Sequence, residues 1–276
     1  MKAEYVRHMG DDLAVADAAR VSFNKKSEWV QRRYEKDQED TDFHELKVLD
    51  EEFPARYEEY EDYSLSHDDE GYELTGFELS RKDQKLITYL AKHDHYTPFT
   101  HPQITMREKV PIFVARQRFK HVVGFSYNEV SRRYVDDTPE FFTPDVWRGR
   151  PEGSIKQGSS DIEIQEMYNY IDQEILDRSD CGERIGVEDQ YSYLIKICTG
   201  LYDKMVEAGV APEQARMVLP QSMYTEYVVT GSLAAWARAY KLRIDGHAQK
   251  EIQDLAKQWN EILRPLFPVS CGALVD

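Results

Sequence analysis

Residues 103–134, QITMREKVPIFVARQRFKHVVGFSYNEVSRRY, decide how the centre of this chain folds. Apolar and polar residues alternate from Gln103 to Val110, which predicts a strand because successive side chains of a strand point to opposite faces. Pro111 suits the first position of a following helix, where its missing N–H costs no hydrogen bond. The buried face of that helix is expected, from helical spacing, at Ile112, Ala115 and Phe119.

Basic side chains crowd the second half of this stretch, where four arginines and one lysine lie between Val114 and Tyr134. Guanidinium and ammonium groups hold phosphate, and Arg does so with two parallel hydrogen bonds. A specific anion pocket is therefore one interpretation. The other is a helix with a solvated charged face, since Arg and Lys are good surface helix formers. The polar run Ser126–Arg133 follows Gly124 and favours caps and loops over a helix.

Charge and length limit the possible partners. The chain has 276 residues and a formal net charge of −16, of which −14 comes from 17 acidic and three basic residues between Glu35 and Glu73. A charge of this sign opposes nonspecific binding to nucleic acid or to acidic membranes. No apolar run approaches the roughly 20 residues that span a bilayer, and residues 1–14 lack the apolar centre of a secretory signal. We therefore expect neither a membrane nor a nucleic-acid partner.

Cysteine usage points to a reducing compartment. Cys181, Cys198 and Cys271 are odd in number, lie far apart and form no CxxC pair. This pattern is typical of buried or inert thiols, so a cytoplasmic location is the simplest expectation.

The remainder of the chain predicts an α+β fold with a central, mostly antiparallel sheet flanked by long helices, in one domain over residues 1–276. Residues 25–79 are expected to be an acidic insertion, solvated and partly helical, and residues 136–160, rich in Pro, Gly and Ser, a loop. Ser80 and Asp83 have the spacing of a capping box. Further helices are expected over residues 11–19, 80–93, 161–209 (one or two helices), 212–220 and 232–240.

Three separated patterns resemble those of the flavin-dependent thymidylate synthases. That family has an Arg-His-Arg triplet followed a few residues later by Ser-x-Arg-Tyr, and here Lys120–Val122 (Lys-His-Val) is followed after eight residues by Ser131. The second pattern is Ala-Arg-x-Val-Leu-Pro at Ala215–Pro220, and the third is Leu-Arg-x-Asp-x-His-Ala-Gln-x-Glu-Ile at Leu242–Ile252. Agreement of three motifs in order is far more specific than any one of them.

The resemblance implies a set of ligand-binding residues and no metal ion. Arg243 matches the arginine at the uracil ring, where it would be catalytic by stabilising charge on N3 and O4 as hydride reaches C6. The residues implied to bind dUMP are Gln117, Glu129, Ser131, Arg133, Arg216 and Arg243. The residues implied to bind FAD are His95, Thr97, Lys120, His121, Glu129, Arg238 and His247.

The implied reaction is the reductive methylation of dUMP to dTMP. In the family, methylenetetrahydrofolate supplies the carbon, NADPH reduces the flavin, and reduced FAD delivers the hydride. The family also implies a homotetramer with active sites shared between subunits. Ser131 would then bind nucleotide rather than attack it, since no nucleophile elbow surrounds it.

The chain departs from the family pattern around the flavin. Val122 cannot replace the last arginine of the triplet, and Arg118 or Arg238 is expected to substitute for it unless the loop places the flavin differently. Two positions that usually hold Asn and Arg are Ser232 and Ala234.

Three other interpretations stay open. An RNA-binding protein would use the Arg118–Arg133 patch, with Phe125 and Tyr127 stacking on bases. A metallohydrolase would use neighbouring histidines as ligands, although such spacing without a Cys or carboxylate is weak zinc evidence. The candidate ligands are His93, His95 and His101. Finally, the basic cluster could be only the solvated face of an acidic domain.

Overall fold

The computed structural model describes residues 1–35, 47–50, 64–68, 71–131, 138–151, 158–168 and 184–276. The chain divides into two compact units, each built from three segments. Unit 1 comprises Met1–Arg7, Ile104–Gly231 and Ala235–Ile262, and unit 2 comprises His8–Gln103, Ser232–Ala234 and Leu263–Asp276. None of the helices in the described ranges is both long and apolar enough to cross a bilayer.

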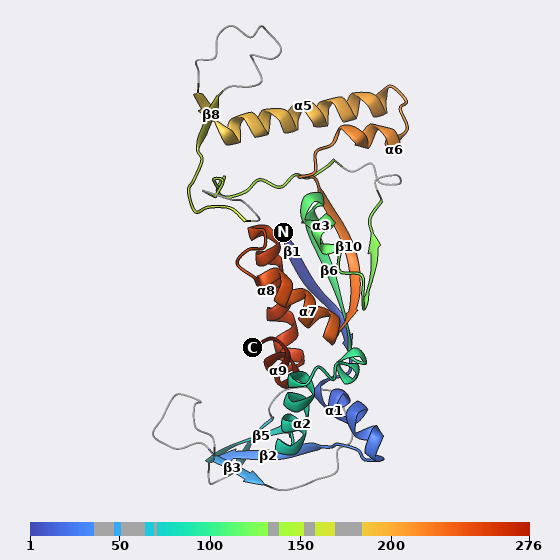
Figure 1. Cartoon of the computed structure of the whole chain (residues 1–276), viewed down its shortest axis with the longest axis vertical. Helices are drawn as coiled ribbons and strands as arrows, with labels where there is room; N and C mark the ends of the chain where they lie inside the picture. The colour runs from blue at the N-terminus through green and yellow to red at the C-terminus, as the bar shows by residue number, and fades with distance from the viewer. Residues whose placement is uncertain (36–46, 51–63, 69–70, 132–137, 152–157, 169–183) are drawn as a thin grey trace. The chain divides into compact units, whose positions relative to one another are not determined.

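Unit 1 is organised around a four-stranded antiparallel sheet in the order β1-β6-β10-β7 (Figure 1). Its strands are β1 (Lys2–Met9), β6 (Gln103–Pro111), β10 (Tyr224–Ser232) and β7 (Phe125–Glu129). The strand predicted over residues 103–110 is thus confirmed, with Ile104, Met106, Glu108 and Val110 buried on one face. In the pairing of β10 with β7, Tyr227 lies opposite Glu129 and Gly231 opposite Phe125.

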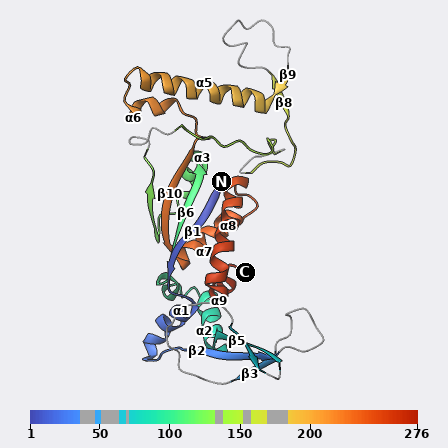
Figure 2. The same ribbon diagram turned by 180° about the vertical axis from the view of Figure 1, so that it is seen from behind.

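Helices α7 and α8 lie alongside this sheet in both views (Figures 1 and 2). The helices and short elements of this part of the chain are α3 (Ile112–Arg118), β8 (Glu166–Tyr168), β9 (Arg184–Gly186), α5 (Val187–Glu207), α6 (Pro212–Ala215), η3 (Arg216–Val218), α7 (Leu233–Ile244) and α8 (Lys250–Leu266). Trp236 on α7 and Trp259 on α8 are fully buried, with ring centroids 5.5 Å apart. Trp236 Nε1 donates to Ile104 O of β6 at 3.2 Å, which ties α7 to the sheet. The predicted α+β class is confirmed.

Helix α3 covers only the first part of the basic stretch Val114–Tyr134. Pro111 is its N-cap rather than its first residue, and α3 ends at Arg118. Gly124, with φ of +79°, then turns the chain into β7. The polar residues from Ser126 to Glu129 therefore lie on a strand, where alternate side chains face opposite ways.

Unit 2 contains η1 (Val21–Phe23), η2 (Thr97–Thr100) and helices α1 (Asp12–Arg20), α2 (Arg81–Lys92) and α9 (Pro268–Val275). The predicted cap is confirmed, since Ser80 accepts from Asp83 N at 3.1 Å, and Asp11 likewise caps α1 by accepting from Ala14 N at 2.8 Å. Buried Asp12 accepts from Val269 N at 2.7 Å and from Ser270 N at 2.9 Å, so α1 caps the first turn of α9.

One secondary-structure prediction is wrong for the described residues. The described parts of residues 25–79 form strands and no helix, because apolar residues recur with a period of two (Tyr72 and Leu74, then Phe77 and Leu79) beneath the dominant acidic charge. The strands β2 (Trp29–Glu35), β3 (Lys47–Asp50), β4 (Ser64–Asp68) and β5 (Gly71–Leu79) make a second sheet, β3-β2-β5-β4. Within the described part of residues 161–209, β8 and β9 precede one long helix, α5, which ends before Gly209 at φ +87°, in keeping with the prediction of one or two helices. The described parts of 136–160 form no helix or strand, as predicted.

Candidate active site

Arg118 at the end of α3 is buried completely, with a side-chain exposure of 0%. Its Nε donates to the carboxylate of Glu108 on β6, 3.2 Å from Oε2 and 3.4 Å from Oε1, and the Glu108 side chain is equally buried. Four rings surround the guanidinium at 4.4 to 5.1 Å, those of Phe125, Tyr127, Trp236 and Trp259. A Cβ at position 231 would overlap the Phe125 ring, so Gly231 lets that ring take its place.

This burial corrects two expectations that treated Arg118 as a surface group. Enclosed in unit 1, Arg118 cannot replace the missing arginine at position 122 by reaching a flavin. It also cannot contact RNA, and Phe125 and Tyr127 turn their rings toward it instead of offering them to bases. The physical reason is Glu108, which the alternation of β6 places on the apolar face, where an unpaired carboxylate would be costly.

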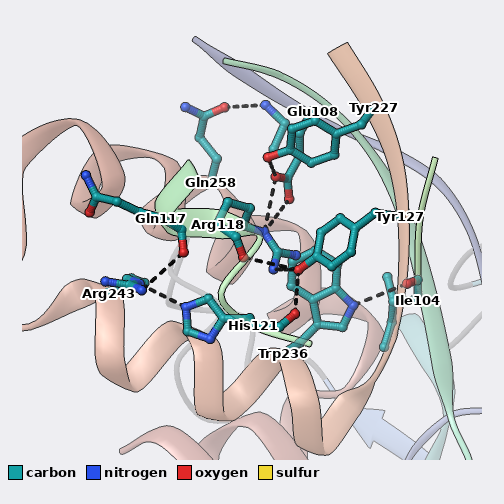
Figure 3. Close-up of polar contacts among 11 residues, drawn as sticks. Ile104, Glu108, Gln117, Arg118, His121, Tyr127, Tyr227, Trp236, Arg243 and Gln258 are labelled. Atoms are coloured by element: carbon teal, nitrogen blue, oxygen red, sulfur yellow. Dashed lines mark hydrogen bonds and ion pairs between the residues drawn. The ribbon is translucent and has the colours of Figure 1, made fainter. Parts of the chain in front are cut away.

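Two tyrosine hydroxyls complete this cluster (Figure 3). Tyr227 donates to Glu108 Oε2 at 2.5 Å, and Tyr127 accepts from Arg118 Nη1 and donates to His121 O at 2.8 Å. Burial raises the pKa of Tyr127 to about 12, and burial together with Glu108 raises the pKa of Tyr227. Both hydroxyls therefore keep their protons at neutral pH and act as donors.

Arg243 on α7 contacts the end of α3 and the turn that follows it (Figure 3). Its Nε lies 2.8 Å from His121 Nε2, and its Nη2 donates to Gln117 O at 3.2 Å. The Gln117 side chain in turn donates to Gln249 Oε1. Three predicted ligand-binding residues, Gln117, His121 and Arg243, are thus brought into direct contact, with the Arg243 guanidinium only partly exposed.

His121 accepts a hydrogen bond because its ring is neutral. Burial, and then the positive charges of Arg243, Arg118 and Arg238, lower the pKa of His121 from 6.5 to about 4. A neutral imidazole offers one lone pair, here Nε2, to the Arg243 Nε–H.

We expect the His121 ring to titrate in nuclear magnetic resonance spectra near pH 4 rather than near pH 6.5. Since the unfolded state binds this proton at higher pH than the folded state, the free energy of unfolding should fall as the pH drops from 6.5 to about 4. The loss should be on the order of 2 kcal/mol. Urea denaturation at both pH values checks this, with His121→Gln, which lacks the titrating ring, as the control. A midpoint near 6.5 would contradict the neutral acceptor.

The remaining predicted residues of unit 1 occupy the surface. Glu129, at the end of β7, accepts from Thr225 Oγ1 at 2.6 Å, and Ser131 follows two residues later. Arg216 is exposed on η3, with its Nε 3.3 Å from Glu213 O, and contacts none of the other predicted residues among those the structure describes. Arg133 lies outside the described residues.

The turn between α3 and β7 brings together three of the residues that were expected to hold FAD, Lys120, His121 and Arg238. Lys120 is exposed there, and Arg238 of α7 donates from Nη2 to Val123 O at 2.5 Å. Val122 and Val123 are each 66% exposed, so a ligand can reach this turn. His247 lies beyond α7, with its Nδ1 2.9 Å from Asp245 Oδ1. Arg238, unlike Arg118, is a cation at the surface beside Val122.

In unit 2, His95 and Thr97 are exposed around η2. His95 and His93 form an aromatic group with Tyr89, at ring-centroid distances of 4.3 to 6.5 Å. Across the described ranges, no three His, Cys, Asp or Glu side chains are grouped so as to hold a metal ion. The metallohydrolase interpretation therefore finds no ligand set in those ranges.

A cavity of about 490 Å³ in unit 1 lies away from the predicted ligand residues. Trp147, Tyr191, Gln249 and Glu251 are among its lining residues, and Glu251 pairs with Arg148. It adjoins the candidate site only through Gln249, the partner of Gln117. We place the chemistry at Arg243 because the matched polar residues converge there and not in the cavity.

Sequence reasoning missed the residues whose hydrogen bonds hold Arg118 and Gln117 in place. Glu108 had a visible signal, a carboxylate in an apolar position of an alternating strand, and Gln249 lies inside the third family pattern. Tyr127 and Tyr227 gave no such signal, since a tyrosine in a strand is ordinarily packing.

Comparison with known proteins identifies the family. The family described as Thymidylate synthase complementing protein matches residues 4–269. The flavin-dependent thymidylate synthase of Thermosipho melanesiensis is 36% identical over 194 residues, covering 70% of this chain and 76% of that protein. That of Thermotoga neapolitana is 30% identical over 272 residues, covering 99% and 89%.

A solved structure shows the same fold. The UMP/dUMP methylase PolB from Streptomyces cacaoi, bound with 5-Br dUMP, matches with a TM-score of 0.61 and 23% identity, over 99% of this chain and 93% of that one. Sequence motifs, fold and relatives agree, and the chain belongs to the flavin-dependent thymidylate synthase family.

Proposed function

We propose that the chain is a FAD-dependent thymidylate synthase that methylates dUMP to dTMP, with methylenetetrahydrofolate as the carbon donor and NADPH as the reductant. The observation that carries the proposal is the contact of the partly exposed Arg243 guanidinium with Gln117 and His121, 126 and 122 residues earlier in the sequence. Membership of the family supports the reaction class.

Nucleotide binding needs cations and amides for a phosphate and a carboxylate for a sugar hydroxyl. The exposed guanidinium of Arg216 and the Gln117 amide are suited to the phosphate, and Glu129 is suited to the sugar. The proposed dUMP-binding residues are Gln117, Glu129, Ser131, Arg133, Arg216 and Arg243.

The groups around the turn after α3 fit FAD chemically. Lys120 and Arg238 supply positive charge for a pyrophosphate, and exposed Val122 and Val123 supply apolar surface for a ring. The proposed FAD-binding residues are His95, Thr97, Lys120, His121, Glu129, Arg238 and His247. We further propose a homotetramer whose subunits share each active site. When bound, reduced FAD supplies the hydride that the reaction needs at uracil C6.

Arg243 is proposed to stabilise the transition state. Negative charge develops along N3 and O4 of the uracil as C6 is reduced, and a guanidinium meets two such acceptors with parallel donors. His121 and the Gln117 carbonyl hold Nε and Nη2, so the guanidinium is oriented before the substrate arrives.

Colour and product formation test this function together. The purified protein should show the absorption of oxidised flavin and convert dUMP to dTMP when given methylenetetrahydrofolate and NADPH, as followed by mass spectrometry. A colourless protein that makes no dTMP but binds oligonucleotides in a salt-dependent way would favour the RNA-binding interpretation.

Ser131→Ala should raise the Kd for dUMP roughly tenfold yet retain part of the turnover. The substitution removes one hydrogen bond from a neutral hydroxyl to the phosphate, which is worth about 1–1.5 kcal/mol. Calorimetric titration with dUMP and steady-state rates at saturating dUMP separate the two effects. Ser126→Ala, on exposed β7 surface, serves as the matched control. Complete loss of turnover with unchanged dUMP binding would instead assign Ser131 a chemical role.

A further inference from the structure

We infer that Tyr127 is a positioning residue for Arg243, because its hydroxyl links the buried Glu108–Arg118 pair to the turn whose histidine holds the Arg243 guanidinium. The inference rests on the proposed function for the catalytic role of Arg243. No family pattern used above assigns a role to Tyr127, Arg118 or Glu108.

The first link begins at a fixed point. Arg118 has 0% side-chain exposure, is paired with equally buried Glu108, and is enclosed by four aromatic rings. Any other position of this buried guanidinium would leave its charge without the Glu108 carboxylate, which is energetically costly. Its Nη1 donates to the Tyr127 hydroxyl, which therefore has a defined location.

The second link passes from the hydroxyl to the backbone. Tyr127 donates to His121 O at 2.8 Å, within the turn formed by residues 119–124. Among the described residues, the only other side chain that donates to a carbonyl of this turn is Arg238, at Val123 O. Phe119 and His121 pack against the rest of unit 1, and His121 N donates to Arg118 O at 3.1 Å, but Val122, Val123 and Gly124 are exposed, so the Tyr127 bond is one of few side-chain restraints on this turn.

The third link reaches the proposed catalytic group. Arg243 Nε lies 2.8 Å from His121 Nε2, and Nη2 lies 3.2 Å from Gln117 O. These two bonds fix one edge of the guanidinium, whereas Nη1 has no partner among the described residues. A shift of the His121 ring would rotate the Arg243 guanidinium, which the two bonds hold (Figure 3).

Tyr227 is a matched control within the same cluster. Its hydroxyl donates to Glu108 Oε2 at 2.5 Å, and its ring packs against Phe119 with centroids 4.8 Å apart. Its hydroxyl makes no bond to the turn in the described part of the chain. Removing either hydroxyl perturbs the buried pair, but only removing that of Tyr127 frees His121.

The test compares Tyr127→Phe with Tyr227→Phe in the full-length flavin-loaded protein. Both substitutions should lower the melting temperature. Tyr127→Phe should in addition lower kcat for dTMP formation roughly tenfold to a hundredfold, with the KM for dUMP changed less than about threefold, because a displaced catalytic group costs rate more than binding. It should also raise the pKa of His121 from about 4 toward 6.5 as the ring becomes more solvated. Tyr227→Phe should change kcat and the His121 titration much less than Tyr127→Phe does, because its hydroxyl makes no bond to the turn in the described part of the chain.

Two results would overturn the inference. One is a normal kcat in Tyr127→Phe, and the other is a His121 titration that is the same in both variants. The titration is read without turnover, so it tests the link even if the wild-type protein forms no dTMP. Failure of the proposed function is thereby distinguished from failure of the positioning role.

Discussion

Replacing Arg243 by alanine should lower the rate of dTMP formation by about a thousandfold while the purified protein keeps its yellow colour. Loss of one preorganised donor to a developing oxyanion costs about a hundredfold to a thousandfold, and Arg243 offers two donors to the uracil edge. Its contacts to His121 and Gln117 orient it in advance, so the loss should appear in kcat more than in the KM for dUMP. Single-turnover rates at saturating dUMP measure the effect directly.

Two controls separate geometry from charge. Arg243→Lys keeps a cation but replaces a planar fork with a point charge, so it should recover little of the rate. Arg107→Ala removes an exposed arginine of β6 in the same unit and should leave turnover near the wild-type value. In Arg243→Ala, the pKa of His121 should also rise, because one of the positive charges that lower it is gone. Turnover near the wild-type value in that variant would remove Arg243 from the mechanism.

Replacing Glu108 by alanine should lower the free energy of unfolding by about 3–5 kcal/mol, because it leaves the fully buried Arg118 charge without its partner. The double variant Glu108→Leu with Arg118→Met should lose much less free energy of unfolding than the sum of the losses in Glu108→Leu and in Arg118→Met. Both buried charges are absent from the double variant, so neither is left without a partner. Urea denaturation of the two single variants and the double variant gives the coupling energy between the side chains.

The exposed pair between Arg107 and Glu226 provides the comparison for that experiment. It joins β6 to β10, whereas the buried pair joins β6 to α3, and the Arg107 side chain is 59% exposed. Arg107→Ala should therefore change the free energy of unfolding by less than about 1 kcal/mol. Equal small losses from the buried and the exposed substitutions would show that solvent reaches Arg118.

Local sequence signals predicted the elements whose cause is local. The alternation from Gln103 to Val110 and the capping residue Ser80 both correspond to observed structure. The strands between Trp29 and Leu79 were missed because net charge dominated the interpretation, although charge says little about whether a backbone pairs. Strand pairing joins residues that are far apart in the sequence, and it cannot be read from the local pattern of one sequence.

In the candidate site, too, local signals were predictive and tertiary contacts were not. Motif spacing selected Gln117, His121 and Arg243, which lie together, but it could not distinguish buried Arg118 from exposed Arg116 two residues earlier. That distinction depends on Glu108, ten residues away on another element, and on rings contributed by β7, α7 and α8. The physical determinant is thus tertiary packing rather than the identity of the basic residue.

The capping of α9 by Asp12 has a consequence for biosynthesis. Unit 2 takes its residues from both ends of the chain, and the carboxylate of Asp12 finds its two donors only at Val269 and Ser270. During translation, α1 therefore leaves the ribosome long before α9 is synthesised. The Asp12 carboxylate stays solvated until more than 250 further residues have been made. Unit 2 is completed after translation has passed residue 270, so nascent chains stalled earlier should expose it to proteases and chaperones.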